Sequence, residues 1–170
     1  MIIMKKYYLI KVIYRNREFF LIWYSDIEDT FLLHEQKLLM FKNLKDIKIF
    51  AEKQGFLLEE EITVYDFSNI IDLINHVELS ENCCTLFAAW NFFSDLAKSI
   101  NEEFVGDSDE ELILNIYDKL FYGCNLKALK RDEEYHPKFD YEEKQKCVSV
   151  FLNGLAMLDK EFNIVIEWFL

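Results

Sequence analysis

The residue types that could act as nucleophiles, bases or metal ligands are scattered through the 170-residue sequence. Four cysteines include one adjacent pair but no C-x-x-C: Cys83, Cys84, Cys124 and Cys147. Three histidines stand apart from one another: His34, His76 and His136. There is no H-E-x-x-H, calcium-loop or G-x-S-x-G pattern, and the four glycines are too dispersed for a phosphate loop. We therefore expect reduced core thiols, no metal and no cofactor, with a Cys–His hydrolase as an open alternative.

Carboxylates form several runs along the chain. They occupy residues 59–61, 102–103, 132–134 and 142–143, and four of the five positions in the cluster 107–111. Two carboxylates at a fixed separation beside a cleft could support glycosidase-like acid–base chemistry, but a sequence does not give that separation. The ordinary reason for such a run is a solvated surface. Spread over one surface, however, carboxylates also imitate a polyanion and can occupy a basic, phosphate-binding groove on another protein.

The stretch AAWNFFSDLA, residues 88–97, places two short polar side chains among aromatic residues. Asn91 and Asp95 are four residues apart, so on a helix they share one face. No nucleophile or base stands close to them in sequence, and a half-buried polar group must find a hydrogen-bond partner. We therefore expect Asn91 and Asp95 to be a structural polar pair that joins elements of the fold.

The net charge of −12 and the pI of about 4.7 restrict the class of partner. Nucleic acids and anionic membranes attract clustered Lys and Arg, so direct binding to either is disfavoured. A basic protein surface is favoured, although acidity also serves solubility alone. The first residues, MIIMKKYYLIKVIYRNREFF, are interrupted by charges and do not resemble a signal peptide. No run reaches the ~18 apolar residues of a spanning helix. We expect a cytoplasmic protein that does not enter membranes.

The first part of the chain is rich in aromatic and β-branched residues with alternating polarity. Residues 7–14 and 18–24 predict a β-hairpin with Asn16 in its turn. Two further short strands, at about residues 30–34 and 38–41, flank a turn near Glu35 and Gln36. These segments predict a sheet built mainly from local connections.

A helix and another strand follow this region. Asn43 can cap a helix that continues through Lys53, and Gly55 suits the left-handed residue after it. A strand at residues 61–67 comes next. The order of these elements predicts an N-terminal antiparallel β-sheet with one helix on a face.

From about residue 67 the apolar period changes to that of a helix. A short helix is predicted within residues 67–77 and a longer one over residues 82–100. The stretch DSDEELILNIYDKLFYG gives the clearest helical pattern, with Ser108 and Glu111 as a capping box and Gly123 as its stop.

The last helix is predicted to begin at Asp140, with Glu143 three residues later as its capping partner. The fold class is therefore α+β, with a strand-rich region at about residues 1–66 and a helical region at about residues 67–170. No glycine or proline lies near their junction, so we expect one domain over residues 1–170.

Two stretches, AAWNFFSDLAKSI and NIYDKLFYGCNLKAL, resemble the helical half of bacterial contact-dependent growth inhibition immunity proteins. The matching positions are Trp90, Asn91, Asp95, Tyr117, Asp118, Lys119, Leu120, Phe121, Gly123, Asn125 and Leu126. The resemblance implies a small cytoplasmic protein that forms a heterodimer with the C-terminal toxin domain delivered by a neighbouring cell. Such proteins neutralise the toxin, often a nuclease that acts on transfer RNA, by covering its active site or a nearby surface. No catalytic residue is implied, so the expectation is an inhibitor and not an enzyme.

A nuclease surface that holds RNA is commonly basic, and an acidic inhibitor suits it physically. We therefore expect the partner contacts among acidic residues of the helical region: Glu102, Glu103, Asp107, Asp109 and Glu110. Immunity proteins vary most where they touch their toxins, so the matched motifs are expected to hold the fold instead. A small carboxylate- or Cys/His-dependent hydrolase and a generic acidic adaptor are the alternatives.

Overall fold

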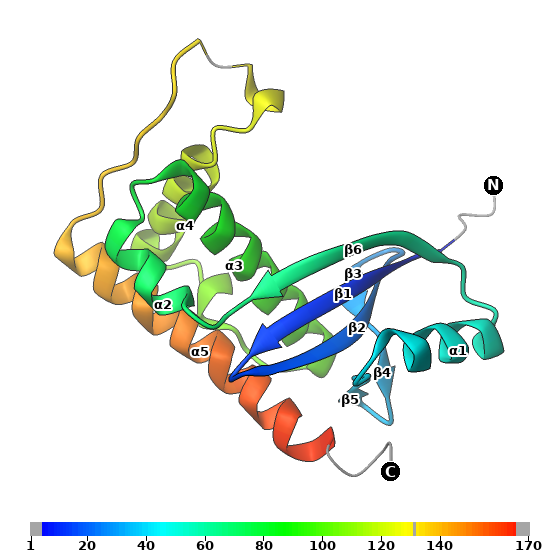
Figure 1. Cartoon of the computed structure of the whole chain (residues 1–170). Coiled ribbons are helices and arrows are strands. Elements are labelled where there is room, and N and C mark those ends of the chain that lie inside the picture. Colours follow the sequence, from blue (N-terminus) through cyan, green and yellow to red (C-terminus); the bar gives the residue numbers. More distant parts are fainter. Residues whose placement is uncertain (1–4, 131, 166–170) are drawn as a thin grey trace. The chain divides into compact units, whose positions relative to one another are not determined.

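The computed structural model describes residues 5–130 and 132–165, which form an α+β fold (Figure 1). A mixed sheet with one helix comes first along the chain and a helical half follows, so the predicted fold class is confirmed. Packing divides the described chain into two compact units. The sheet unit holds residues 5–68, 95–102 and 158–165, and the helical unit holds residues 69–94, 103–130 and 132–157. The single domain expected over residues 1–170 stays a prediction.

The sheet begins with an antiparallel hairpin of β1 (Lys6–Tyr14) and β2 (Arg17–Ser25). Arg15 and Asn16 between them have φ angles of 51° and 59°. Two successive left-handed residues make a type I′ turn, whose twist matches that of the flanking strands. The predicted hairpin with Asn16 in its turn is confirmed.

Three short strands follow. β3 (Asp29–Phe31) pairs with β2, whereas β4 (Leu33–His34) and β5 (Lys37–Leu38) form a separate two-stranded sheet. Glu35 and Gln36, with φ angles of 51° and 67°, make the turn between β4 and β5. This is the turn that the sequence predicts.

Helix α1 (Leu44–Gln54) has both of its predicted ends. The Asn43 side chain accepts a hydrogen bond from the backbone N–H of Asp46 at 3.0 Å and so caps the first turn. Gly55 follows the helix at a φ of 70°, a conformation that costs glycine little because it has no Cβ.

Strand β6 (Leu58–Asp66) pairs with β1 in parallel and completes the sheet order β3-β2-β1-β6. The prediction of a wholly antiparallel sheet is therefore wrong at this pair. The physical reason is the crossover, because α1 returns the chain to the end of the sheet where β1 begins (Figure 1).

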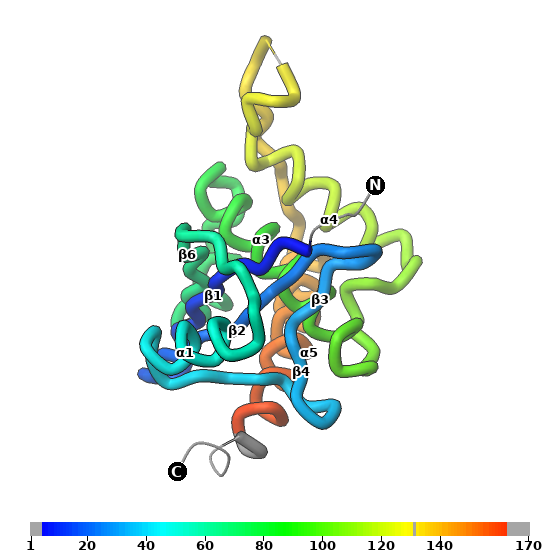
Figure 2. The backbone as a smooth tube through the Cα atoms, turned by 90° about the vertical axis from the view of Figure 1, so that its right-hand side faces the viewer, coloured from blue at the N-terminus to red at the C-terminus, as the bar shows by residue number. Residues whose placement is uncertain are grey.

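The sheet of this unit is covered on both faces. Helix α1 lies against β2 (Figure 2), and on this side buried apolar residues form a cluster: Leu9, Phe20, Ile22, Leu39, Phe41 and Ile47. On the alternate face, the ring of Phe19 lies 4.3 Å from that of Phe162, and the Phe31 N–H donates to Ser99 Oγ at 2.8 Å. The last turns of two long helices, α3 (Ser80–Ile100) and α5 (Tyr141–Val165), therefore belong to the sheet unit.

The helical unit contains the other parts of α3 and α5 and five shorter elements: α2 (Ile70–Leu73), η1 (Ile74–His76), η2 (Val105–Asp107), α4 (Glu111–Gly123) and η3 (Lys127–Leu129). Its core is aromatic. The Trp90 ring is 1% exposed and meets the rings of Phe104 and Phe151 edge to face, at 6.1 and 5.9 Å. The indole N–H donates to the Gly106 carbonyl at 3.2 Å, which satisfies the one polar atom of this ring.

The ends of α4 differ from the prediction. The helix begins at Glu111, and Ser108 Oγ accepts from the Glu110 N–H instead of closing a capping box with Glu111. The local turn at Ser108 is favoured over a longer helix because the hydroxyl binds a donor only two residues away. α4 does end at Gly123, but a Cβ there would lie 2.5 Å from the Cys83 sulfur, so close packing explains this glycine.

Candidate partner-binding surface

The outer face of α4 carries several acidic residues beside an exposed leucine. Ile113, Ile116 and Leu120 are buried on the inner face of the helix. The other side borders a shallow depression lined by Glu110, Glu111, Leu112, Leu114, Asn115 and Asp118. Leu114 is 51% exposed at this place. The arrangement is an apolar contact point among carboxylates, and we call these six residues the acidic α4 face.

The five predicted contact residues do not form one cluster. Glu102 belongs to the sheet unit, where its carboxylate pairs with Lys160 at 3.0 Å. Glu110 pairs with Lys146 at 2.9 Å. These two charges are therefore largely compensated within the chain.

The other three predicted contact residues carry charges that no ion pair in the described ranges compensates. Glu103, Asp107 and Asp109 belong to the helical unit, are exposed, and form no ion pair within residues 5–130 and 132–165. Glu111 and Asp118, which the prediction omitted, share this property and lie on the acidic α4 face. Their spacing of seven residues, beside an apolar stripe of helical period, was the signal that could have identified them.

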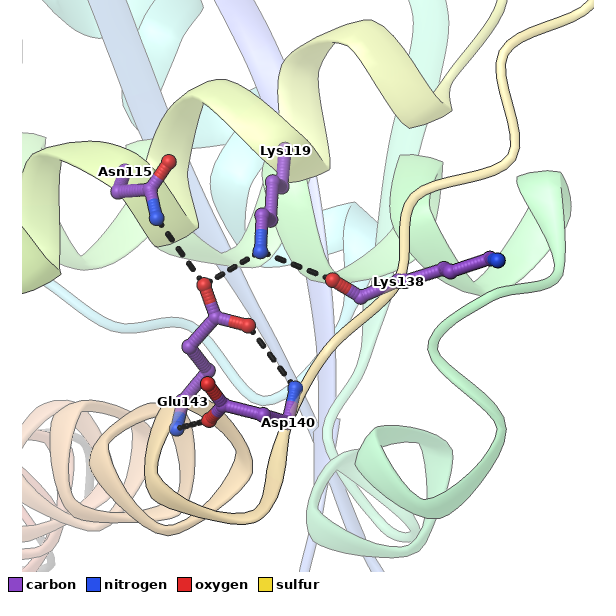
Figure 3. Close-up of polar contacts among 5 residues, drawn as sticks. All are labelled: Asn115, Lys119, Lys138, Asp140 and Glu143. Carbon is purple, nitrogen blue, oxygen red and sulfur yellow. Dashed lines mark hydrogen bonds and ion pairs between the residues drawn. The ribbon is translucent and has the colours of Figure 1, made fainter.

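The orientation of α4 depends on the buried carboxylate of Glu143 (Figure 3). This side chain is 4% exposed. One oxygen accepts from Asn115 Nδ2 at 3.0 Å and from the Lys119 ammonium, and the other accepts from the Asp140 N–H at 2.9 Å. Lys119 also donates to the Lys138 carbonyl at 2.8 Å. The network fixes one side of α4 to the start of α5.

The start of α5 confirms the predicted capping box. Asp140 Oδ1 accepts from the Glu143 N–H at 2.9 Å, and Glu143 reaches back to the Asp140 N–H (Figure 3). Each side chain therefore satisfies a backbone donor that the first helical turn leaves free. The link from Glu143 to α4 was not predicted.

Asn91, one member of the predicted structural pair, forms hydrogen bonds within the helical unit. Its Nδ2 donates to the Phe87 carbonyl at 3.0 Å, and its Oδ1 accepts from the Tyr117 hydroxyl at 3.0 Å. Both Asn91 and Tyr117 are half-buried. The amide therefore joins α3 to α4.

Asp95, the other member, bonds within the sheet unit. Its carboxylate accepts from Trp23 Nε1 at 3.2 Å and lies 3.7 Å from the Lys98 ammonium. Burial raises the pKa of Asp95 above its ordinary value, and nearby Asp29 adds to that effect, whereas Trp23 and Lys98 oppose it. Burial, followed by the Asp95 charge, also raises the pKa of Tyr65.

Asn125 lies just after α4, at the start of the connection that leads to α5. The described parts of this connection extend away from the helices of their unit (Figure 2). The Asn125 amide donates to the Tyr135 carbonyl at 2.9 Å and to the Gly123 carbonyl at 3.1 Å, and it accepts from the Tyr135 N–H at 2.6 Å. The backbone of Asn125 has a φ of 50°, which asparagine tolerates.

Two of the four thiols donate hydrogen bonds to backbone carbonyls. Cys83 donates to the Val77 carbonyl at 2.8 Å and Cys84 to the Cys124 carbonyl at 3.4 Å. Burial raises the pKa of Cys83 to about 11 and that of Cys147 to about 12, so these sulfurs stay protonated at neutral pH. In the part of the chain that the structure describes, no group of three or more His, Cys, Asp and Glu side chains is arranged to hold a metal ion.

Comparisons with protein-family models, with curated proteins and with solved structures find no match for this chain. Within the described ranges, every helix is too short or too polar to cross a membrane.

Replacement of Asn91 by alanine should destabilise the fold. The change removes the hydrogen bond that the half-buried Tyr117 hydroxyl donates to Asn91, and losing a partner of this kind costs about 1–3 kcal/mol. Urea unfolding measures the loss. Asn75→Ala is the control, because Asn75 is exposed and Lys144 bonds to its backbone carbonyl, which the substitution keeps. Unchanged stability together with lost partner binding would reverse the role assigned to Asn91.

Replacement of Asp95 by asparagine should change how stability depends on pH. Because the folded pKa of Asp95 is raised, its protonated form stabilises the fold below the ordinary value of 3.8, and this contribution is lost as pH rises through the folded pKa. Asp95→Asn can still accept from Trp23 but never ionises. Its stability relative to the natural chain should therefore increase from pH 3 toward pH 7, as chemical denaturation measures.

The control for Asp95 is Asp66→Asn, which should show the opposite trend. Two hydrogen bonds from Ser68 hold the pKa of Asp66 below its ordinary value, so its ionised form stabilises the fold and that contribution is lost on acidification. Parallel pH profiles for the two variants would contradict the assignment of Asp95 as a carboxylate penalised by burial.

Replacement of Glu143 by glutamine should weaken the attachment of α4. The amide can still accept from the Asp140 N–H, but the half-buried Lys119 ammonium loses its counter-charge. We expect a loss of about 3 kcal/mol, the usual consequence of removing one partner of a buried ion pair. Thermal unfolding measures it, with exposed Glu142→Gln as the neutral control. A second change, Lys119→Met, should restore part of the loss, and no recovery would contradict the charge argument.

Proposed function

We propose that this chain is a cytoplasmic immunity protein that binds a cognate toxin domain and neutralises it without catalysing a reaction. In this proposal the two proteins form a heterodimer, and the toxin domain presents a basic surface of the kind that nucleases use to hold RNA. The inhibitor covers the toxin active site or a surface beside it.

The observation that carries the proposal is the acidic α4 face with the loop before it. Asp107, Asp109, Glu111 and Asp118 are exposed and have no ion-pair partner in the described ranges, and exposed Leu114 lines the same depression as Glu111 and Asp118. Uncompensated carboxylates around an apolar anchor suit a cationic protein surface, because the charges steer the encounter and the leucine gains by burial. The net charge of −12 acts in the same direction at longer range.

The positions that carry the family resemblance support the proposal in a second way. Trp90, Asn91, Lys119, Gly123 and Asn125 all make contacts that hold the helical unit together. A family that shares a fold but varies in its partners would keep such residues and change its exposed ones. This pattern is consistent with the sequence expectation that the matched motifs stabilise the fold.

The alternatives receive less support. Hydrolysis by a Cys nucleophile needs an accessible thiolate, whereas burial raises the pKa of Cys83 and Cys147 far above neutrality. An acidic adaptor would use the same surface as an inhibitor. Only the identity of its basic partner separates these two functions.

Co-expression with the toxin domain encoded beside this gene tests the proposal. Cells should survive, and the two proteins should elute together. The triple variant Asp107→Lys, Asp109→Lys and Asp118→Lys should slow association about tenfold or more at low salt, and the effect should shrink at high salt.

The matched control changes the same number of carboxylates on the loop between α4 and α5, in the variant Asp132→Lys, Glu133→Lys and Glu134→Lys. It has the same net charge as the test variant and should bind with nearly the natural rate constant. Cell death with the natural chain and no complex would refute the proposed function. An equal loss in both variants would refute only the acidic α4 face as the contact.

A further inference from the structure

Strand β6 lies at the edge of its sheet and has a single neighbouring strand, β1. Most of its nine side chains are exposed, including Thr63 and Val64, the latter by 54%. No other strand in the described ranges pairs with its outer side. An exposed edge of this kind is a template for another extended segment.

The direction of the backbone groups can be derived from one contact. The Phe67 N–H, directly after the strand, donates to the Ile13 carbonyl of β1 at 2.9 Å. In a parallel ladder both polar groups of a residue point to the same side, and the side alternates along the strand. Thr63 therefore bonds toward β1, whereas the N–H and C=O of Val64 point to the outer edge.

The charges of β6 select which segment can pair there. The register with β1 shifts between Tyr7 and Leu9, so the acidic residues Glu59, Glu60 and Glu61 lie at an irregular start of the strand. The paired stretch from Ile62 ends at Asp66. The ammonium of Lys6 lies 3.9 Å from Glu59 and offsets one of these charges, whereas Glu60 and Glu61 have no ion-pair partner in the described ranges.

A second copy of this chain is a poor occupant for the edge. Two β6 strands would bring together two sets of these carboxylates on chains that each carry a charge of −12. Like charges on neighbouring strands repel, and natural edge strands use this repulsion against self-association. The same carboxylates attract a strand that carries lysine or arginine.

We propose that β6 binds an extended, lysine- or arginine-bearing segment of the partner protein by strand addition at its outer edge. Main-chain hydrogen bonds to Val64 supply affinity, and cationic side chains near Glu59, Glu61 and Asp66 supply selectivity. The inference rests on the proposed function for the identity of the partner, but its geometry comes from the sheet alone.

The test uses the purified chain and a catalytically inactive form of the neighbouring toxin domain. Val64→Pro removes the outward N–H, and proline is tolerated on the solvent side of an edge strand. This variant should keep its melting temperature within about 5 °C and bind about tenfold more weakly or worse. Val64→Ala keeps the N–H and should bind like the natural chain. Thr63→Pro removes a bond to β1 and should lower the melting temperature instead.

Amide hydrogen exchange of the natural chain gives a second readout that does not depend on any variant. The Val64 amide should exchange at least about tenfold more slowly in the complex than in the free chain, because a new partner accepts its hydrogen bond. Unchanged exchange at Val64 in a formed complex would overturn the proposal even if Val64→Pro failed to fold. Equal affinity of Val64→Pro and the natural chain would overturn it too.

Two further outcomes identify where an error lies. If the natural chain binds no toxin domain at all, the proposed function fails, whether or not strand β6 binds another segment. If the natural chain is a dimer in solution and Val64→Pro makes it monomeric, the edge belongs to a second copy and the inference about a cationic segment is wrong. Sedimentation measures this state.

Discussion

The carboxylate of Glu143 is the constraint on which the helical unit depends. It accepts hydrogen bonds from the Asp140 backbone, from Asn115 and from Lys119, and it is almost fully buried. A buried charge is costly unless its oxygens are fully satisfied, so this group tolerates few positions of α4. The exposed side of the same helix is thereby presented in one orientation. Asn115 belongs to the acidic α4 face and also bonds to Glu143, so this face is tied directly to the buried carboxylate.

The polar residues of the helices divide into two kinds. Asn91, Lys119 and Asn125 are held in bonds to other elements, whereas Asp107, Asp109 and Asp118 are exposed and have no ion-pair partner in the described ranges. The first kind determines the shape of the unit and the second its surface potential. A chain organised in this way can change its exposed charges with little effect on its stability, because surface substitutions away from buried contacts cost little. This separation suits a protein whose partner changes faster than its fold.

Local features of the fold could be predicted from the sequence because their causes are local. The turn at Asn16, the caps at Asn43 and Gly55, and the Asp140–Glu143 box each involve neighbours in the chain. The parallel pairing of β6 could not be predicted, because it depends on where the α1 crossover returns the chain. The bonds from Asn115 and Lys119 to Glu143 also escaped prediction, since 28 and 24 residues separate the partners.

The candidate surface was predictable only in part for the same reason. The acidic composition indicated that the surface charge is negative. It did not indicate that Lys160 and Lys146 compensate the charges of Glu102 and Glu110. Those pairs join residues that are 58 and 36 positions apart. Conversely, the helical spacing of Glu111 and Asp118 is visible in the sequence. The contact residues were nevertheless expected in runs of consecutive acidic residues and not on one periodic helix face. Periodicity within α4 was the better guide to the exposed carboxylates.

The charged edge of β6 has a consequence for which substitutions the chain can tolerate. Glu59, Glu60 and Glu61 place three negative charges at the start of an edge strand, and like charges oppose the approach of a second copy. The stretch that follows, around Thr63 and Val64, is β-prone and contains neither proline nor lysine. Substitutions that remove the three exposed glutamates would therefore cost the fold little and yet favour aggregation at this strand, so these carboxylates act as gatekeepers against edge-to-edge pairing.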